Sequence, residues 1–375
     1  MRIVVAIDSF KGSLSSLQAG EAVKEAALKA DKTAQVLVRP LADGGEGTVD
    51  ALAAGFGGQK VCARVTGPYS DRVDVEYCIM PNQTAVIEMA SVAGLPLVPE
   101  EMRNPMHTTT YGVGELIKDA IYRGCRHFIV GIGGSATNDG GAGMLMALGY
   151  RLLDTEGEEI PLGAKGLEKL YAISADSVLP ELKECTFKVA CDVNNPLCGQ
   201  NGCSVVYGPQ KGAAPMEIVQ MDGWLKGFAD LTTRWNPKAD LNYPGAGAAG
   251  GLGFAFLAYT NSVLESGIQI IMEEIKLEEA IAQADLVITG EGRLDRQSVM
   301  GKAPVGVAKL AKKYGKKVIA FSGCVASGAE ICNDHGIDAY FPIIRGVTTL
   351  DEALNTENAY QNLTDTAYQV FRLLL

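Results

Sequence analysis

The sequence is poor in the residues that most metal and redox sites use. It contains only three histidines, His107, His127 and His335, and none of its nine cysteines forms a CxxC pair. A zinc site or a disulfide framework is therefore not expected. Reduced, mostly buried thiols in the cytosol fit this cysteine usage better.

The sequence also lacks the signatures of several enzyme classes. We find no GxxxxGK[ST], no protein-kinase signature set and no GxSxG. This excludes a P-loop ATPase and a protein kinase, and it leaves a serine hydrolase without support. The segment "GAGAAG" at 245–250 matches GxGxxG but follows Pro244 instead of a strand. Close packing of small residues explains it better than dinucleotide binding by a 2-hydroxyacid dehydrogenase.

Charge and hydropathy restrict the partners. The formal net charge of −11 argues against nucleic acid or an anionic membrane surface as the main partner. The longest run without charge, 241–264, contains Pro244 and several glycines, so it is a poor membrane span. The first apolar run ends at Asp8, too early for a secretory signal. We expect a cytoplasmic protein with small-molecule partners, and the sequence leaves homo-oligomerisation open.

The order of strand-like and helix-like patterns predicts two domains. With 375 residues the chain is longer than one core usually supports. Residues 1–60 alternate strand and helix, and the same style returns after residue 283. Between them, short alternating runs separated by turn residues predict hairpins. We expect a discontinuous α/β domain with a parallel sheet (1–60 and 283–375), an inserted mixed α+β domain (61–282) and a ligand cleft between them.

Glycine-rich segments follow several predicted strands, and each contains a carboxylate. They are "DSFKGS" (8–13), "ADGGEGT" (42–48), "GGSATNDGGAGM" (133–144) and "TGEGRLD" (289–295); Asp192 ends a further strand without glycine. Ligands of open α/β sheets bind at the carboxyl ends of strands, where glycine lets backbone N–H groups approach oxyanions. Lys11, Lys211, Arg293 and Lys302 add isolated cations. This combination is typical of phosphoryl transfer, which depends on positioning and charge neutralisation.

Together with "CDVNNPL", "GPQKGA", "PGAGAAGGLG" and "GKAPVGVA", these motifs resemble the bacterial glycerate kinases that phosphorylate D-glycerate. The resemblance runs from the first strand to the last helix. It implies a flavodoxin-like domain built from both termini, ATP and Mg²⁺ as cofactors, and D-glycerate as the acceptor. The similar members produce 2-phosphoglycerate and ADP. One departure is Ile7, where the family often has proline before the first aspartate.

Strand-end position and the resemblance together suggest roles for individual residues. We expect Lys11 or Arg293 to hold the glycerate carboxylate, and Asp43 or Asp192 to accept or orient the hydroxyl proton. Backbone of 133–143 and 44–47 would cradle ATP phosphates or substrate. The further candidates for binding substrate or phosphate are Asp8, Ser9, Gly44, Gly45, Glu46, Gly133, Gly134, Ser135, Asn138, Asn194 and Lys302, and those for Mg²⁺ are Asp139, Glu291 and Asp295.

Two alternatives stay open from the sequence. Transfer to the 3-hydroxyl would give 3-phosphoglycerate, because small differences in placement decide which hydroxyl reacts. A non-catalytic sugar-acid binding protein is the other, although carboxylates beside an anion do not favour pure anion binding. Each candidate carboxylate could also simply cap a helix.

Overall fold

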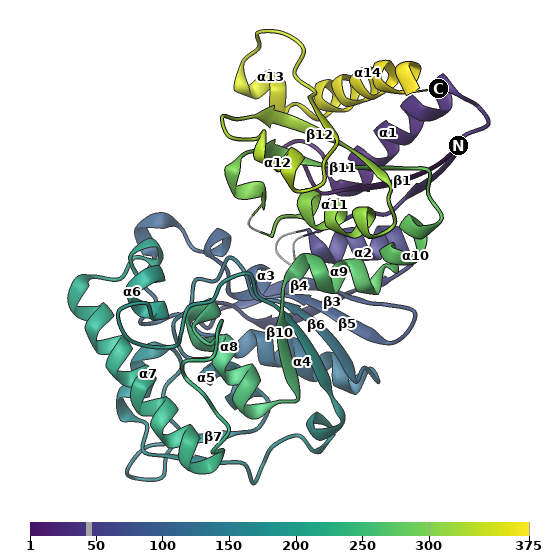
Figure 1. The fold of residues 1–375 in the computed structure, drawn as a ribbon. Coiled ribbons are helices and arrows are strands. Elements are labelled where there is room, and N and C mark those ends of the chain that lie inside the picture. Colours follow the sequence, from purple (N-terminus) through teal and green to yellow (C-terminus); the bar gives the residue numbers. More distant parts are fainter. Residues whose placement is uncertain (43–46, 300, 375) are drawn as a thin grey trace. The chain divides into compact units, whose positions relative to one another are not determined.

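The protein, described by a computed structural model over residues 1–42, 47–299 and 301–374, divides into two compact units (Figure 1). We call residues 1–43, 50–57 and 268–375 the terminal unit, and residues 44–49 and 58–267 the inserted unit. The sequence placed the second boundary at 283. The contacts instead group the helices before it with the terminal unit, where Gly306 of α11 (Ala303–Lys313) lies close to Ile268 and Met272.

A parallel sheet forms the centre of the terminal unit. Its strand order is β13-β12-β11-β1-β2, and every neighbouring pair is parallel. The strands are β1 (Arg2–Ile7), β2 (Gln35–Val38), β11 (Leu286–Leu294), β12 (Lys317–Val325) and β13 (Ala339–Pro342). The order reverses direction at β1, as in flavodoxin-like sheets, so the predicted fold class is confirmed.

Helices cover both faces of this sheet. Helix α1 (Ser16–Ala30) begins at the capping box that the sequence predicts, in which Ser15 and Gln18 exchange hydrogen bonds. Its apolar face packs with α14 (Thr356–Leu374) over Ile3, Val5 and Ile7, while α11 packs on the other face. The remaining helices are α2 (Thr48–Phe56), α9 (Gly267–Glu274), α10 (Leu277–Ala282), α12 (Ile331–Asp334) and α13 (Leu350–Leu354).

Strand β11 corrects one prediction. The sequence suggested a glycine-rich loop beginning at Thr289, but the strand continues to Leu294 and pairs with β12 as far as Val325. Gly290 permits this pairing, because a Cβ there would lie only 2.1 Å from the backbone oxygen of Phe321. The carboxylate of Glu291 is therefore presented by a rigid strand.

A mixed sheet forms the centre of the inserted unit. Its order is β10-β9-β6-β5-β4-β3, with antiparallel pairs from β3 to β5 and parallel pairs from β5 to β10. The strands are β3 (Gln59–Thr66), β4 (Arg72–Ile79), β5 (Thr84–Glu88), β6 (His127–Gly131), β9 (Thr186–Ala190) and β10 (Ser262–Glu265), and β7 (Arg151–Leu153) pairs separately with β8 (Ala172–Ser174). The predicted hairpins are confirmed for β3 to β5 and for residues 151–160, where Leu153 pairs with Glu159 in antiparallel fashion.

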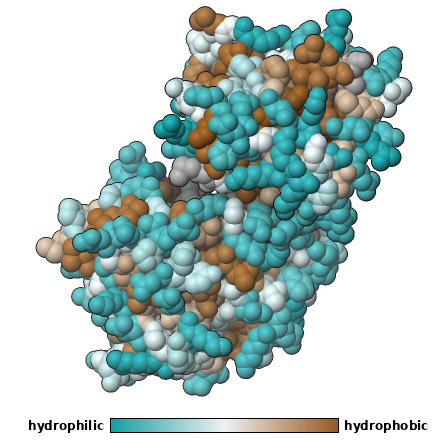
Figure 2. All heavy atoms as spheres, viewed as in Figure 1, coloured by the Kyte–Doolittle hydropathy of each residue, from teal (hydrophilic) through white to brown (hydrophobic). Residues whose placement is uncertain are grey.

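Apolar helices pack against this sheet and complete one large core. The helices of the inserted unit are α3 (Ala90–Ala93), α4 (Tyr111–Tyr122), α5 (Ala142–Ala147), α6 (Cys203–Tyr207), α7 (Pro215–Trp235) and α8 (Ala248–Tyr259). All nine cysteines are free thiols. In the described part of the chain, no helix combines the length and apolarity that crossing a membrane requires. Polar side chains predominate on the face drawn in Figure 2.

Candidate functional site

The segment that follows β6, residues 133–144, is called the glycine segment here. It exposes two glycine residues just after the strand. Gly133 and Gly134 are exposed, and Gly134 has a left-handed φ of 72°. Neighbouring backbone holds the segment through bonds from Leu95 N to Gly134 O (2.9 Å) and from Ala136 N to Ala93 O (2.9 Å). Within the described residues, neither the Gly133 N–H nor the Gly134 N–H has a protein acceptor. Successive free amides of this kind can bind an anion.

Asp139 lies within the same segment, five residues after Gly134, and is fully buried. Its carboxylate accepts hydrogen bonds from Thr110 N (2.8 Å), Thr110 Oγ1 (2.9 Å), Gly141 N (3.0 Å) and Gly143 N (3.3 Å). Burial raises its pKa, and the donors of Thr110, Gly141 and Gly143 oppose that rise. Both oxygens accept hydrogen bonds from protein donors, so the structure does not support the prediction that Asp139 binds magnesium. Asp139 holds the turn into α5 against the start of α4.

Lys211 is the second buried charge at the segment. Its side chain is 3% exposed, and Nζ donates to Ser135 Oγ (2.8 Å) and to Thr137 O (2.7 Å). Burial lowers the pKa of Lys211 to about 8, against the opposing influences of Cys203 and Asp139. From the sequence, Lys211 was predicted only as an isolated cation in "GPQKGA". Nothing in that motif indicated a buried ammonium bound to the glycine segment.

The predicted binding side chains Ser135 and Asn138 are buried as well. Ser135 Oγ is an acceptor for Lys211, and Asn138 Nδ2 donates to Ser204 Oγ (2.8 Å). Asn138 is fully buried and its Oδ1 has no partner among the described residues. These contacts give both side chains a role inside the segment. Its exposed backbone at Gly133 and Gly134 is what remains open to a ligand.

The "PGAGAAGGLG" segment packs closely against the backbone of the glycine segment. At the start of α8, Gly250 O accepts from Gly140 N (2.9 Å), and a Cβ on Gly250 would lie 2.1 Å from Thr137 O. Ala249, Gly250 and Gly251 all have left-handed φ values there. Close backbone packing explains this motif, as the sequence indicated.

Further polar groups follow the neighbouring parallel strands of the inserted unit. Gly131 at the end of β6 pairs with Ala190 of β9, so Asp192 and Asn194 follow at the same edge, and both are exposed. Asp192 Oδ1 accepts from Gly267 N at 3.2 Å. The sequence missed Glu88, which ends β5 opposite Gly131, and Glu265, which ends β10 opposite Ala190. Their position as the last residue of a short strand was the only signal.

The terminal unit contains a second group of charged residues. Ser298 Oγ donates to the buried Glu291 Oε1 at 2.5 Å, and Lys302 Nζ lies 3.5 Å from Glu291 Oε2 and 3.7 Å from Asp295 Oδ1. Arg293 Nε lies 3.5 Å from Asp295 Oδ2. Burial raises the pKa of Glu291, and the hydrogen bond of Ser298 and the charge of Lys302 oppose that rise. The structure thus brings four of the predicted residues together.

The loop after β1 lies beside this group. Ile7 of β1 pairs with Gly290 of β11. Asp8 and Glu291, the next residue on each of these neighbouring strands, therefore lie side by side. Asp8 is mostly buried and its Oδ1 accepts from Ser9 N at 2.7 Å, while Lys11 is exposed. The predicted residues Asp43, Gly44, Gly45 and Glu46 lie outside the described residues.

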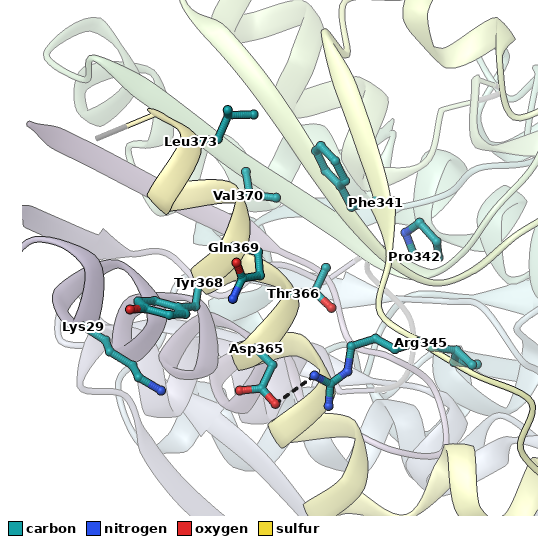
Figure 3. Close-up of a pocket in the computed structure, with 11 residues that line it drawn as sticks. Lys29, Phe341, Pro342, Arg345, Asp365, Thr366, Tyr368, Gln369, Val370 and Leu373 are labelled. Carbon is teal, nitrogen blue, oxygen red and sulfur yellow. Dashed lines mark ion pairs between the residues drawn. The ribbon is translucent and has the colours of Figure 1, made fainter.

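A surface pocket of the terminal unit lies elsewhere (Figure 3). It is lined by the end of β13 and by α14, with the ion pair of Arg345 and Asp365 at 3.0 Å. Lys29 and Tyr368 stand next to each other at its side, with Nζ 4.8 Å from the ring centroid. None of the predicted site residues lines this pocket, so it is not part of the candidate site.

Free amides follow β6 in the inserted unit, and in the terminal unit Lys302 lies close to Glu291 of β11 and to Asp295. Both kinds of group are compatible with phosphate binding. A model of the Glycerate kinase family matches residues 3–375, and the chain belongs to that family. The chain is 46% identical to the glycerate 2-kinase of Escherichia coli K12 over 97% of this chain and 95% of the relative. It is 45% identical to the glycerate kinase of Haemophilus influenzae over 100% and 99% of the two chains.

A solved structure agrees with this assignment. The chain superimposes on a crystal structure described as "putative glycerate kinase 2 from Salmonella typhimurium LT2" with a TM-score of 0.92 and 45% identity. The match covers 100% of this chain and 98% of that one. The fold and the family therefore agree over the whole length, and the predicted family is confirmed.

Proposed function

We propose that this chain transfers the γ-phosphoryl group of ATP to the 2-hydroxyl of D-glycerate, giving 2-phosphoglycerate and ADP. Family membership and the relative from E. coli named glycerate 2-kinase support this reaction. The structural observation that carries it is the pair of exposed amides at Gly133 and Gly134, which lack a protein acceptor among the described residues. An ATP-dependent reaction and free thiols both fit the cytoplasm.

In the inserted unit, the amides of Gly133 and Gly134 bind phosphate oxygens of ATP. Asp192 accepts the proton of the reacting hydroxyl, and Asn194 binds a hydroxyl of the substrate. Both side chains are exposed at the same edge of the sheet as the glycine segment. A carboxylate beside the acceptor hydroxyl orients it for attack and takes its proton as the bond to phosphorus forms.

In the terminal unit, Lys11 or Arg293 holds the glycerate carboxylate, and Lys302 neutralises phosphate charge. Asp8 and Ser9, in the loop that follows β1 beside Glu291, bind substrate or phosphate. A lysine beside the phosphates lowers the energy of the transition state, because negative charge moves toward the leaving ADP during the transfer.

Magnesium is compatible with Glu291 and Asp295. Mg²⁺ prefers oxygen ligands and is commonly bound through one or two carboxylates, with water and substrate phosphates completing its shell. Among the described residues no group of three or more potential ligands gathers, so a site with few protein ligands is the type that fits. When bound, Mg²⁺ would supply charge neutralisation on the phosphates. Glu291 is held for this by Ser298, and Lys302 balances both carboxylates.

ADP release from ATP, Mg²⁺ and D-glycerate tests the reaction. Adding enolase without phosphoglycerate mutase then tests the position, because only 2-phosphoglycerate is converted directly to phosphoenolpyruvate. Phosphoenolpyruvate formation at the rate of ADP release is expected. ADP release without it would indicate the 3-hydroxyl. Binding of glycerate with no ADP release would instead indicate a non-catalytic sugar-acid binding protein.

A further inference from the structure

Lys211 enters the interior of the inserted unit from a short turn bounded by glycines. The turn Pro209–Lys211 follows α6, and Gly212 after it has a left-handed φ of 90°. A Cβ at Gly212 would lie 2.1 Å from Arg103 O, so the backbone there is packed closely. This turn fixes the direction of the Lys211 side chain and leaves it 3% exposed.

The ammonium group reaches the glycine segment from its buried side. It donates to Ser135 Oγ at 2.8 Å and to Thr137 O at 2.7 Å, and these two residues flank Ala136. Ser135 directly follows the exposed amides of Gly133 and Gly134. Hydrogen bonds from a charged donor are about twice as strong as neutral ones, so two of them restrain the segment effectively.

The charge of Lys211 lies in a poorly solvated interior, because the residue is 3% exposed. Asp139 and Cys203 are the titratable groups whose charges act on Lys211. Burial raises the pKa of the Cys203 thiol to about 11, so this group is neutral near pH 7. A positive charge at Lys211 favours an anion at the adjacent backbone, because charges interact more strongly in a poorly solvated interior.

We propose that Lys211 is a positioning residue that, through its bonds to Ser135 and Thr137, holds the amides of Gly133 and Gly134 ready for the phosphates of ATP. The inference rests on the proposed function for the identity of the ligand. It assigns the segment after β6 to the nucleotide and not to D-glycerate. A backbone that must bind a multiply charged ligand gains affinity when it is held in its bound form beforehand.

The test compares Lys211→Met, Lys211→Arg and the exposed control Lys226→Met of α7. Equilibrium binding of ATP by calorimetry needs no acceptor, so it remains informative even if glycerate is not the substrate. We expect Lys211→Met to weaken ATP binding by ~10-fold or more, because the amides of Gly133 and Gly134 are then no longer held in their binding conformation. Lys211→Arg should recover part of that loss, Lys226→Met should bind like the parent, and the KM for D-glycerate should change little.

Two further measurements separate positioning from a general loss of structure. Lys211→Met should be less stable than the parent but still fully folded at the assay temperature, because Ser135 Oγ and Thr137 O lose a buried donor; its melting temperature checks this. ATP affinity of the parent should fall as the pH rises above about 8, and the affinity of Lys211→Met should not.

The outcomes decide the proposal. Unchanged ATP affinity in Lys211→Met overturns it, and so does a rise confined to the KM for D-glycerate. Equal loss of ATP affinity in Lys226→Met also overturns it, since the effect would then be nonspecific. Should Lys211→Met unfold, Ser135→Ala replaces it, because this change removes only the Oγ acceptor. A loss of ATP affinity in Ser135→Ala that keeps the parent's melting temperature supports the proposal, and an unchanged affinity overturns it.

Discussion

The buried carboxylate of Asp139 accepts a hydrogen bond of 2.8 Å from the backbone N–H of Thr110, twenty-nine residues earlier in the chain. Together with the bonds from Gly141 and Gly143, this contact ties the glycine segment to the first turn of α4. The only charge in the glycine run of the sequence thus faces inward. The exposed part of the segment, at Gly133 and Gly134, is bare backbone.

Asp139→Ala should therefore destabilise the inserted unit. The substitution leaves several buried donors without an acceptor, and each such group costs ~1–3 kcal/mol. We expect the free energy of unfolding to fall by about 3 kcal/mol or more, measured by urea denaturation. The exposed Asp176→Ala serves as a control and should change it by less than about 0.5 kcal/mol. Parent-like stability in Asp139→Ala would contradict the structural role and restore Asp139 as a magnesium candidate.

Alanine at Gly133 and at Gly134 should separate ligand binding from backbone strain. A Cβ at Gly133 meets no atom within 4 Å, whereas Gly134 has a φ of 72° that alanine adopts with difficulty. Gly133→Ala should keep its stability and raise the KM for ATP, because the methyl group stands beside the anion-binding amides. Gly134→Ala should lose about 1 kcal/mol of stability as well. Gly223→Ala in the exposed part of α7 is the control; an unchanged KM in Gly133→Ala would place the phosphates elsewhere.

Asp192→Asn tests the proton acceptor. The amide oxygen of asparagine can still accept the hydrogen bond from Gly267 N, which Asp192 receives at 3.2 Å, so the fold should be kept. We expect kcat to fall by ~10²–10⁴-fold with little change in either KM, the usual loss when a general base is removed. Steady-state kinetics beside the exposed control Asp240→Asn would show it. A kcat within tenfold of the parent would mean that Asp192 only caps the start of α9.

Lys302→Met should shift the acid limb of the pH–rate profile. Burial already raises the pKa of Glu291, and Lys302 at 3.5 Å counteracts this by favouring the charged form. Without the lysine, Glu291 should stay protonated to higher pH, so activity should begin to fall at a higher pH than in the parent. The profile of kcat/KM measures this shift, and the exposed Lys309→Met of α11 should leave it unchanged. An unshifted acid limb would show that Glu291 is not required in its charged form.

Much of this architecture follows from patterns of short range. The capping box at Ser15 and Gln18, the alternating β1 region and the strand-end glycines predict the terminal sheet and the edge on which its ligand groups lie. The extension of β11 through Glu291 was missed, because glycines usually end strands and the pairing with β12 that overrides them is tertiary. Glu88 and Glu265 were missed because each is the last residue of a short strand that no glycine-rich motif follows. Lys211 meets Ser135 from seventy-six residues away, and no local pattern encodes such a contact.

The stability of the parent relative to Lys211→Met should depend on pH with a defined sign. The folded-state pKa of Lys211 is lowered to about 8, whereas an unfolded lysine titrates near ~10.4. A lysine with a lowered folded pKa favours folding in its neutral form. Its contribution is therefore fully present above the unfolded pKa and is lost as the pH falls through 8. Asp139 and Cys203, the groups that face it, are present in both proteins, so their own titration largely cancels in the difference.

The expected size of this effect is about 3 kcal/mol, from a pKa difference of roughly 2.4 at 1.36 kcal/mol for each pKa unit. Urea denaturation of both proteins at about pH 7 and pH 10 measures it. Between these values the parent should gain stability over Lys211→Met, since its buried ammonium loses the proton before the unfolded chain does. Lys226→Met, at an exposed position, should show no such trend. A stability difference between parent and Lys211→Met that stays constant with pH would contradict this prediction. It would mean that the pKa of Lys211 is the same in the folded and unfolded chain.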